Sequence, residues 1–162
     1  MKPLLYTFAF LILLAGCSGE QTNENLIENA TFTDLDGNDV SLSDFRGKVV
    51  LIDFWESWCG PCLQVFPAMQ ELREEYPDNF VVLAVTVGMM EGKAEAKEFV
   101  EKHDYDFQFL FDEYELFQKI GGHSIPFKIY IDPDGQLIKK ELGSRGRFGD
   151  YNSAKNIILD YL

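Results

Sequence analysis

The sequence predicts an α/β fold in which helices flank a central mixed β-sheet. Residues 49–54 and 80–87 are almost entirely apolar, interrupted by Asp53 and Thr86, which is the composition of central strands covered on both faces. Each run is followed by a stretch of helical periodicity, the order expected of parallel strands joined by crossover helices. Residues 132–135 (Asp-Pro-Asp-Gly) supply a turn between two further strands, so an antiparallel pair is expected to complete the sheet.

The first elements along the chain follow from short-range patterns. Residues 30–35 alternate apolar and polar side chains, Asp36-Gly37 supplies a turn, and residues 40–42 resume the alternation, which predicts a small N-terminal hairpin. Residues 43–48 form a short turn or helical loop before the strand at 49–54. Residues 59–76 carry apolar side chains at helical spacing, and we expect a helix there that is kinked at Pro67.

The second half of the chain continues the same order. After the strand at 80–87, residues 91–102 are predicted to form a helix with an exposed Glu98–Lys102 pair. Residues 107–111 form a short strand or extended core segment, and residues 113–120 a short helix that ends at Gly121-Gly122. The antiparallel strands occupy residues 127–131 and 136–142, and residues 152–162 form a final amphipathic helix.

The N-terminus has the features of an export signal. Residues 1–16 combine Lys2 with an apolar stretch over 6–14 that is too short for a stable membrane-spanning helix. Residues 14–17 (Leu-Ala-Gly-Cys) resemble the lipobox of bacterial lipoprotein signals, in which the cysteine, here Cys17, is lipidated and becomes the first residue. An ordinary secretory signal that leaves Cys17 as a free thiol is the alternative, and both predict export.

The remaining chain divides into a tether and one domain. Residues 17–28 are mostly polar and are predicted to form a flexible tether, and residues 29–162 have the length of a single domain. The formal net charge is −13, and Lys2 is the only basic residue within the signal. The mature protein is therefore strongly acidic, which disfavours nucleic acid and anionic lipid surfaces as partners.

Two cysteines remain for the domain once Cys17 is assigned to the anchor: Cys59 and Cys62. One close pair in an exported domain favours redox chemistry over a structural disulfide framework. The alternatives are an inert disulfide and a metal half-site. Zinc needs two further ligands at a suitable spacing, and because His103 and His123 are the only candidates we expect no metal site.

The C-x-x-C pair lies at the predicted start of the helix over 59–76. Unpaired N–H groups and the helix dipole stabilise a thiolate there, so the pKa of Cys59 is expected to fall below the free value of ~8.5. Cys59 then attacks a substrate disulfide, and Cys62, one turn further on and more buried, resolves the mixed disulfide. Gly60 and Pro61 set the separation of the sulfurs. We expect no cofactor besides the redox-active Cys59–Cys62 disulfide.

Residues 53–62 (Asp-Phe-Trp-Glu-Ser-Trp-Cys-Gly-Pro-Cys) resemble the active-site segment of thioredoxins. Residues 41–54 are similar to the preceding segment of TlpA/ResA-like exported thiol–disulfide oxidoreductases, a redoxin/AhpC-TSA-type branch of the thioredoxin superfamily. The resemblance runs from the region of Ala30 to the C-terminus. It implies a thioredoxin fold with two additions, the N-terminal hairpin and a central insertion over residues 91–120.

The resemblance implies a role for Asp53, which falls where thioredoxins carry a buried carboxylate. Burial would raise its pKa and let it exchange a proton with Cys62, whereas the alternative is an aspartate hydrogen-bonded to the backbone. The lysine that accompanies this aspartate in thioredoxins has no counterpart within residues 80–87. Trp58 matches the aromatic residue beside the nucleophile, and Trp55 is expected in the core.

Residues 124–126 (Ser-Ile-Pro) match the loop that carries a cis-proline facing the cysteines, so a cis bond is expected before Pro126. In the family the residue before this proline pairs with the substrate backbone, and a glycine beside the groove follows the last strand. The resemblance therefore implies a substrate-binding set of Trp58, Gly60, Pro61, Ile125 and Gly143. His123 is either an incidental loop histidine or a group that tunes the disulfide.

The expected function is that of a lipid-anchored thiol–disulfide oxidoreductase on the periplasmic side of a bacterial membrane or at the cell surface. Gly60-Pro61 is the dipeptide of reducing thioredoxins, which favours reduction of disulfides in exported proteins over their oxidation. The resemblance allows apocytochrome c as a substrate and implies a membrane thiol transporter as electron donor.

Three other functions remain open. A thiol peroxidase uses a different cysteine motif on a related fold. A Cu(I) chaperone would use Cys59, Cys62 and His123 as ligands. A binding module would keep the same surface without turnover.

Overall fold

The computed structural model describes residues 18–162, which form a sheet and six helical segments. The strands are β1 (Thr31–Asp34), β2 (Asp39–Ser41), β3 (Val49–Trp55), β4 (Phe80–Thr86), β5 (Gln108–Phe111), β6 (Phe127–Ile131) and β7 (Leu137–Leu142). The helical segments are α1 (Ser18–Glu28), the short 3₁₀ helix η1 (Leu42–Phe45), α2 (Gly60–Glu75), α3 (Lys93–Glu101), α4 (Leu116–Lys119) and α5 (Gly146–Leu159).

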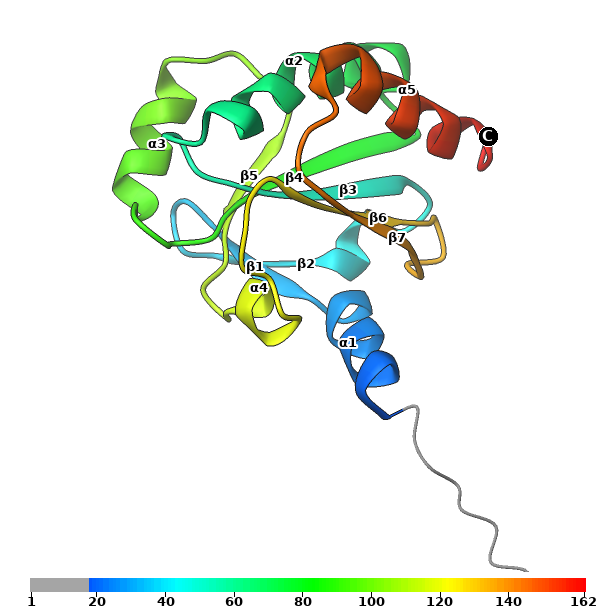
Figure 1. Ribbon diagram of the computed structural model, residues 1–162, viewed down its shortest axis with the longest axis horizontal. Coiled ribbons are helices and arrows are strands. Elements are labelled where there is room, and N and C mark those ends of the chain that lie inside the picture. Colours follow the sequence, from blue (N-terminus) through cyan, green and yellow to red (C-terminus); the bar gives the residue numbers. More distant parts are fainter. Residues whose placement is uncertain (1–17) are drawn as a thin grey trace, which may run out of the picture.

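One seven-stranded mixed sheet separates two helical layers (Figure 1). The strand order is β2–β1–β5–β4–β3–β6–β7, with β5, β4 and β3 parallel and the outer neighbours antiparallel. Helices α2, α3 and α5 cover one face, and α1 and α4 cover the other (Figure 1). The predicted α/β class with a central mixed sheet is confirmed.

Strand β3 is buried along its whole length, as is its parallel neighbour β4. Because side chains alternate along a strand, Leu51 and Trp55 pack under α2 and α5, whereas Ile52 and Phe54 pack against the layer of α1 and α4. Asp53 stands between Leu51 and Trp55 in this alternation. Its side chain therefore points into the apolar layer under α2.

Helix α2 begins directly after the active-site loop, residues 56–59, which follows β3. Cys59 is its N-cap, Gly60 and Pro61 open its first turn, and Pro67 lies inside it, as the sequence predicts. The helix ends at Glu75, before Pro77. The predicted central insertion contains α3, β5 and α4, and β5 joins the hairpin of β1 and β2 to the core by pairing between β1 and β4.

The prediction of a flexible tether over residues 17–28 is wrong from residue 18 onward, because Ser18–Glu28 form helix α1. Ile27 is fully buried in the layer with α4, and the Leu137 N–H donates to Glu28 Oε1 at 3.2 Å. The segment is mainly polar, so its sequence does not indicate that Ile27 packs in the core. The predicted signal peptide over 1–16 and the lipidation site Cys17 lie outside the described residues.

The last helix also differs from the prediction, since α5 begins at Gly146 and not at residue 152. Gly146 and Gly149 lower the helix propensity of this segment and made it resemble a loop. The buried Asp150 accepts hydrogen bonds from the Ser144 hydroxyl (2.6 Å) and the Arg145 N–H, which stabilises the first turn. None of the helices within residues 18–162 is long and apolar enough to span a membrane.

The docking of α1 predicts unequal effects of two neighbouring substitutions. Ile27→Ala should lower the free energy of unfolding by about 2–5 kcal/mol, because it removes fully buried methyl groups and leaves a cavity. Leu26→Ala, at a side chain that is 40% exposed, should cost less than about 1 kcal/mol. Denaturant titration of the purified variants measures both values. Equal and small effects would show that α1 is not packed on the domain.

Candidate active site

The two cysteines of the C-x-x-C motif form a disulfide at the start of α2, with their Cα atoms 5.3 Å apart. Cys59 is 4% exposed and Cys62 is fully buried. The Cys62 N–H points at Cys59 Sγ, at an N–S distance of 3.3 Å. Cys59 is thus the sulfur that reaches the surface, and an N–H group at the helix start faces it, as a thiolate requires.

A shallow groove of about 380 Å³ lies over the disulfide. The Ile125–Pro126 bond is cis, as expected. Pro126 is buried and does not itself line the groove, whereas Ile125 does. Gly143 lies behind this loop, where its N–H donates to the Pro126 carbonyl at 2.8 Å. The groove is lined by Trp58, Cys59, Gly60, Pro61, Met89, His123, Ser124 and Ile125.

The structure therefore brings most of the predicted site residues together. Trp58, Gly60, Pro61 and Ile125 surround Cys59 in the groove, whereas Gly143 does not line it. Met89 is a further wall residue, for which the sequence predicts no role at the site.

Asp53 is fully buried, and neither of its carboxylate oxygens has a hydrogen-bond partner among the described residues. The alternative of an aspartate hydrogen-bonded to the backbone is therefore wrong. Burial raises the pKa of Asp53 to about 8, the positive charge of Lys128 opposes this rise, and the charge of Asp150 adds to it. Asp53 is thus a carboxyl group that holds its proton at neutral pH.

Lys128 is the residue that the sequence analysis missed. In β4 the residue opposite Asp53 is Ala84, so no lysine faces Asp53 from that strand. On the other side of β3, however, Asp53 is in register with Lys128 of β6, which is fully buried. A lysine in the middle of an apolar strand, as in residues 127–131, indicates a buried cation with an acidic partner. Only the strand register shows which residue it faces.

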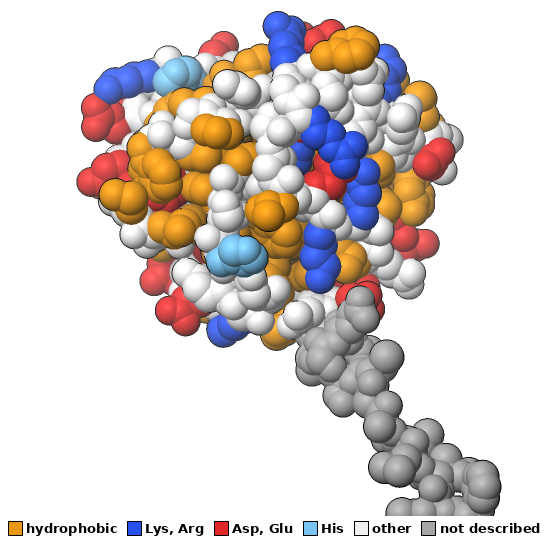
Figure 2. All heavy atoms as spheres, in the orientation of Figure 1, with side chains coloured by type: hydrophobic (Ala, Val, Ile, Leu, Met, Phe, Trp, Pro, Cys, Tyr) orange, Lys and Arg blue, Asp and Glu red, His pale blue; other side chains and the backbone are white. Residues whose placement is uncertain are grey.

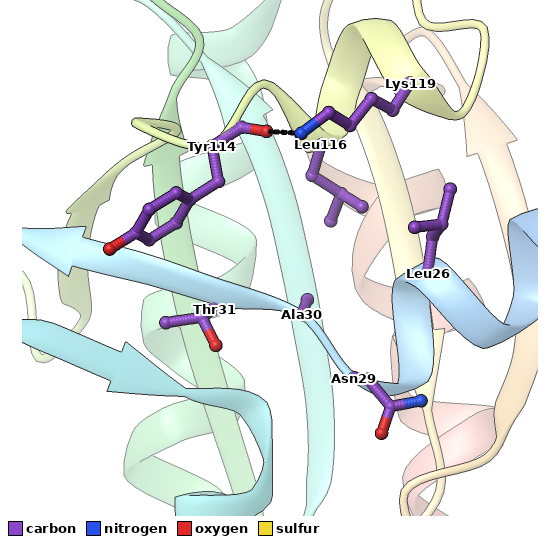
Figure 3. Close-up of a pocket in the computed structure, with 7 residues that line it drawn as sticks. All are labelled: Leu26, Asn29, Ala30, Thr31, Tyr114, Leu116 and Lys119. Carbon is purple, nitrogen blue, oxygen red and sulfur yellow. Dashed lines mark hydrogen bonds between the residues drawn. The ribbon is translucent and has the colours of Figure 1, made fainter.

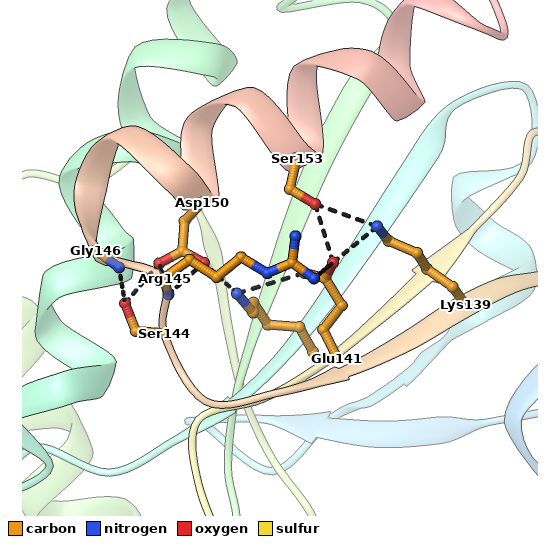
Figure 4. Close-up of polar contacts among 8 residues, drawn as sticks. Lys139, Glu141, Ser144, Arg145, Gly146, Asp150 and Ser153 are labelled. Carbon is orange, nitrogen blue, oxygen red and sulfur yellow. Dashed lines mark hydrogen bonds and ion pairs between the residues drawn. The ribbon is translucent and has the colours of Figure 1, made fainter.

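Lys128 is held by acidic residues of β7 and α5. Its ammonium group pairs with Asp150 and lies 3.6 Å from Glu141 Oε2. Glu141 also pairs with Lys139 (2.7 Å) and Arg145 (3.1 Å), and the Ser153 hydroxyl donates to it. Figure 4 shows Glu141 of β7 in contact with Lys139 and Ser153, and Asp150 of α5 in contact with Ser144. A buried polar network thus supports the cation that opposes Asp53.

Other parts of the described chain offer less chemistry. A pocket of about 180 Å³ between α1 and α4 is lined by Leu26, Tyr114 and Leu116 among others, and its polar contact is the Lys119 ammonium donating to the Tyr114 carbonyl (Figure 3). Residues 18–162 contain no group of three or more His, Cys, Asp or Glu side chains arranged to hold a metal ion.

Comparison with known proteins agrees with this geometry. The model of the Redoxin family matches residues 22–158. A thiol-disulfide oxidoreductase ResA of Bacillus thuringiensis subsp. konkukian is 31% identical over 155 residues, which span 88% of this chain and 89% of the relative. A thioredoxin-like protein YneN of Bacillus subtilis is 33% identical over 111 residues, or 68% of this chain and 65% of the relative.

Solved structures show the same fold. A thiol:disulfide interchange protein DsbE of Chlorobium tepidum superposes with a TM-score of 0.71 at 30% identity, covering 82% of this chain and 92% of that one. The pneumococcal exposed lipoprotein thioredoxin of Streptococcus pneumoniae gives a TM-score of 0.64 at 30% identity, covering 79% and 98%. The predicted thioredoxin fold is confirmed.

The raised pKa of Asp53 predicts a specific dependence of stability on pH. The folded protein keeps this proton up to a pH of about 8, whereas the unfolded chain loses it near the ordinary value of 3.8. Between these values the folded state loses stability by about 1.4 kcal/mol per pH unit relative to an Asp53→Asn variant, whose amide does not titrate. Above the higher pKa the difference should become constant.

Denaturant titrations of the oxidised proteins between pH 5 and pH 9 measure this difference without titration of the cysteines. Asp78→Asn, at an exposed aspartate, is the matched control. Parallel pH profiles for wild type and Asp53→Asn would contradict the raised pKa.

Proposed function

The chain belongs to the Redoxin family and is a thiol–disulfide oxidoreductase of the ResA/TlpA-like thioredoxin type, and from this premise we propose that it reduces disulfides of exported proteins outside the cytoplasm. The observation that carries the proposal is the Cys59–Cys62 pair at the start of α2, which shares a groove with the loop that contains the cis Ile125–Pro126 bond. Gly60-Pro61 between the sulfurs supports the reducing direction.

The exposure of the two sulfurs supports an order of events. In the reduced protein the Cys59 thiolate attacks one sulfur of a substrate disulfide, forms a mixed disulfide and expels the other substrate sulfur as a thiolate. The buried Cys62 then attacks Cys59 Sγ, which closes the Cys59–Cys62 disulfide and releases the second substrate thiol. Two electrons pass from the protein to the substrate, whose two sulfurs take up two protons.

We assign the proton of Cys62 to Asp53. Its side chain points into the layer that contains Cys62, and it has no competing hydrogen-bond partner in the described chain. With a pKa of about 8, a fraction of Asp53 is ionised at neutral pH and can accept the thiol proton as Cys62 attacks. Lys128 acts as a positioning residue that stabilises the ionised form of Asp53 from β6.

The location is supported by two kinds of evidence. Residues 14–17 have the lipobox pattern, and one similar solved structure is an exposed lipoprotein thioredoxin. We therefore propose that Cys17 carries a lipid anchor on the outer side of a bacterial membrane and that a membrane thiol transporter resupplies electrons. Apocytochrome c is one exported substrate that contains the required cysteine pair.

The reducing direction predicts a low equilibrium potential. Equilibration with glutathione or thioredoxin buffers should give a value near ~−270 mV, and the reduced protein should reduce insulin disulfides. Cys59→Ser and Cys62→Ser should both lose insulin turnover. A potential above about −150 mV would instead identify an oxidant and overturn the proposed direction.

The role of Asp53 predicts a slow second step. Asp53→Asn should slow the attack of Cys62 on the mixed disulfide by roughly tenfold or more, because the thiol loses its internal proton acceptor. In wild type the rate of this step should rise toward pH 8, where Asp53, facing Lys128, Asp150 and Tyr130, becomes ionised, and the variant should lose this rise. Stopped-flow fluorescence separates the two steps. An unchanged second step, with Asp78→Asn as the control, would refute the assignment.

A further inference from the structure

Two acidic residues join the active-site loop to the loop that follows β4. Glu56 directly follows β3 and is fully buried. Its carboxylate accepts hydrogen bonds from the indole N–H of Trp58 and from the backbone N–H groups of Met89 and Met90, the last at 3.2 Å. In the opposite direction, Glu91 accepts bonds from the Ser57 N–H (2.8 Å) and the Ser57 hydroxyl. The two loops are therefore fixed to each other from both sides.

Burying the Glu56 carboxylate costs free energy unless neighbouring groups compensate its charge. The described residues provide it with no ion-pair partner, so its charge is compensated only by N–H donors. Gly88, with φ +73°, turns the chain out of β4 across the ring of Phe111, where a Cβ would lie 3.0 Å from the ring. The result of this arrangement is a fixed backbone position for Met89 and Met90.

Both methionines are exposed, and Met89 lines the groove beside Cys59. Met89 and Met90 are 47% and 79% exposed, and Trp58 is 52% exposed. Figure 2 shows hydrophobic side chains gathered over the side of the molecule where α3 and the start of α2 lie. Large apolar side chains exposed in a group usually mark a contact surface. Met89 lines the groove together with Cys59 and Ile125, so this surface adjoins the reacting sulfur.

The groove differs in charge from the rest of the protein. The chain carries a net charge of −13, yet no carboxylate, lysine or arginine side chain lines the groove, whose polar side chains are those of His123 and Ser124. Methionine side chains are flexible and polarisable, so they adapt to apolar groups of different shape. An uncharged, apolar segment of substrate fits this lining, and an acidic segment does not.

We propose that Met89 and Met90 bind a large aliphatic or aromatic side chain next to the reacting cysteine of the substrate, and that Glu56 is the positioning residue of this subsite. The inference rests on the proposed function, for which it names the substrate class: extended, uncharged polypeptide segments with a bulky apolar residue beside the disulfide. Glu56 contacts no substrate and acts through the Met89–Met90 backbone and through Trp58.

A chromogenic single-turnover assay tests the subsite. In a Cys62→Ser background, Cys59 attacks peptides whose single cysteine is joined to thionitrobenzoate, forms a protein–peptide disulfide and releases the coloured thiolate. Peptides with Leu or Phe beside the cysteine should react roughly tenfold faster than those with Ser, and Glu peptides should be slowest. The double substitution Met89→Ser/Met90→Ser should remove most of this preference.

Glu56→Gln should weaken the preference and shift the fluorescence of Trp58, whereas Leu159→Ser, at an exposed apolar residue near the end of α5, should change neither. Equal rates for Leu and Ser peptides, or a preference that survives the methionine substitutions, would overturn the subsite. A preference that survives Glu56→Gln unchanged would remove Glu56 from it. The symmetric disulfide of thionitrobenzoate, which carries no peptide, is the control reagent. If the Cys62→Ser protein failed to react with it, the proposed function itself would be contradicted.

Discussion

The alternation of side chains along β3 is the constraint on which the site depends. Because β3 is buried on both faces, its register is fixed by two apolar layers at once. That register directs Asp53 toward α2, and the end of the strand determines where Glu56 and Cys59 stand. A shift by one residue would turn Asp53 into the layer of α1 and α4 and would separate it from Cys62. The apolar residues of β3 therefore position the chemistry without taking part in it.

Two buried carboxylates near the disulfide, those of Asp53 and Glu56, differ in their hydrogen-bond partners. Asp53 has no hydrogen-bond donor in the described chain, so burial favours its protonated form and gives a group that can gain and lose a proton near neutral pH. Glu56 is surrounded by N–H donors that compensate a negative charge. The first arrangement suits proton transfer, and the second suits a fixed structural contact. Residue type alone does not distinguish these roles, whereas the partners do.

Features that depend on local patterns could be predicted from the sequence, whereas features that depend on tertiary contacts could not. The buried strands, the helix behind the cysteines and the hairpins come from local patterns, and the structure reproduces them closely. The cis bond before Pro126 and the burial of Asp53 were predicted through resemblance, since spacing alone does not specify either. Lys128 was missed because its meaning depends on pairing with Asp53 across strands. Helix α1 was missed because its stability depends on one buried contact of Ile27, a tertiary effect that outweighs local composition.

The topology explains why three separate segments meet at the disulfide. The parallel strands β3 and β4 end at the same edge of the sheet, which places the loops after Trp55 and Thr86 side by side. Strand β6 is antiparallel to β3, so it begins at that edge, with Phe127 opposite Phe54, and β7 ends there. The segment after β3 supplies the cysteines and one wall of the groove, and the loops after β4 and before β6 supply the other walls, with Met89 and residues 123–125. Because the walls belong to different loops, the residues that contact a substrate can vary while the sulfur chemistry on α2 stays the same.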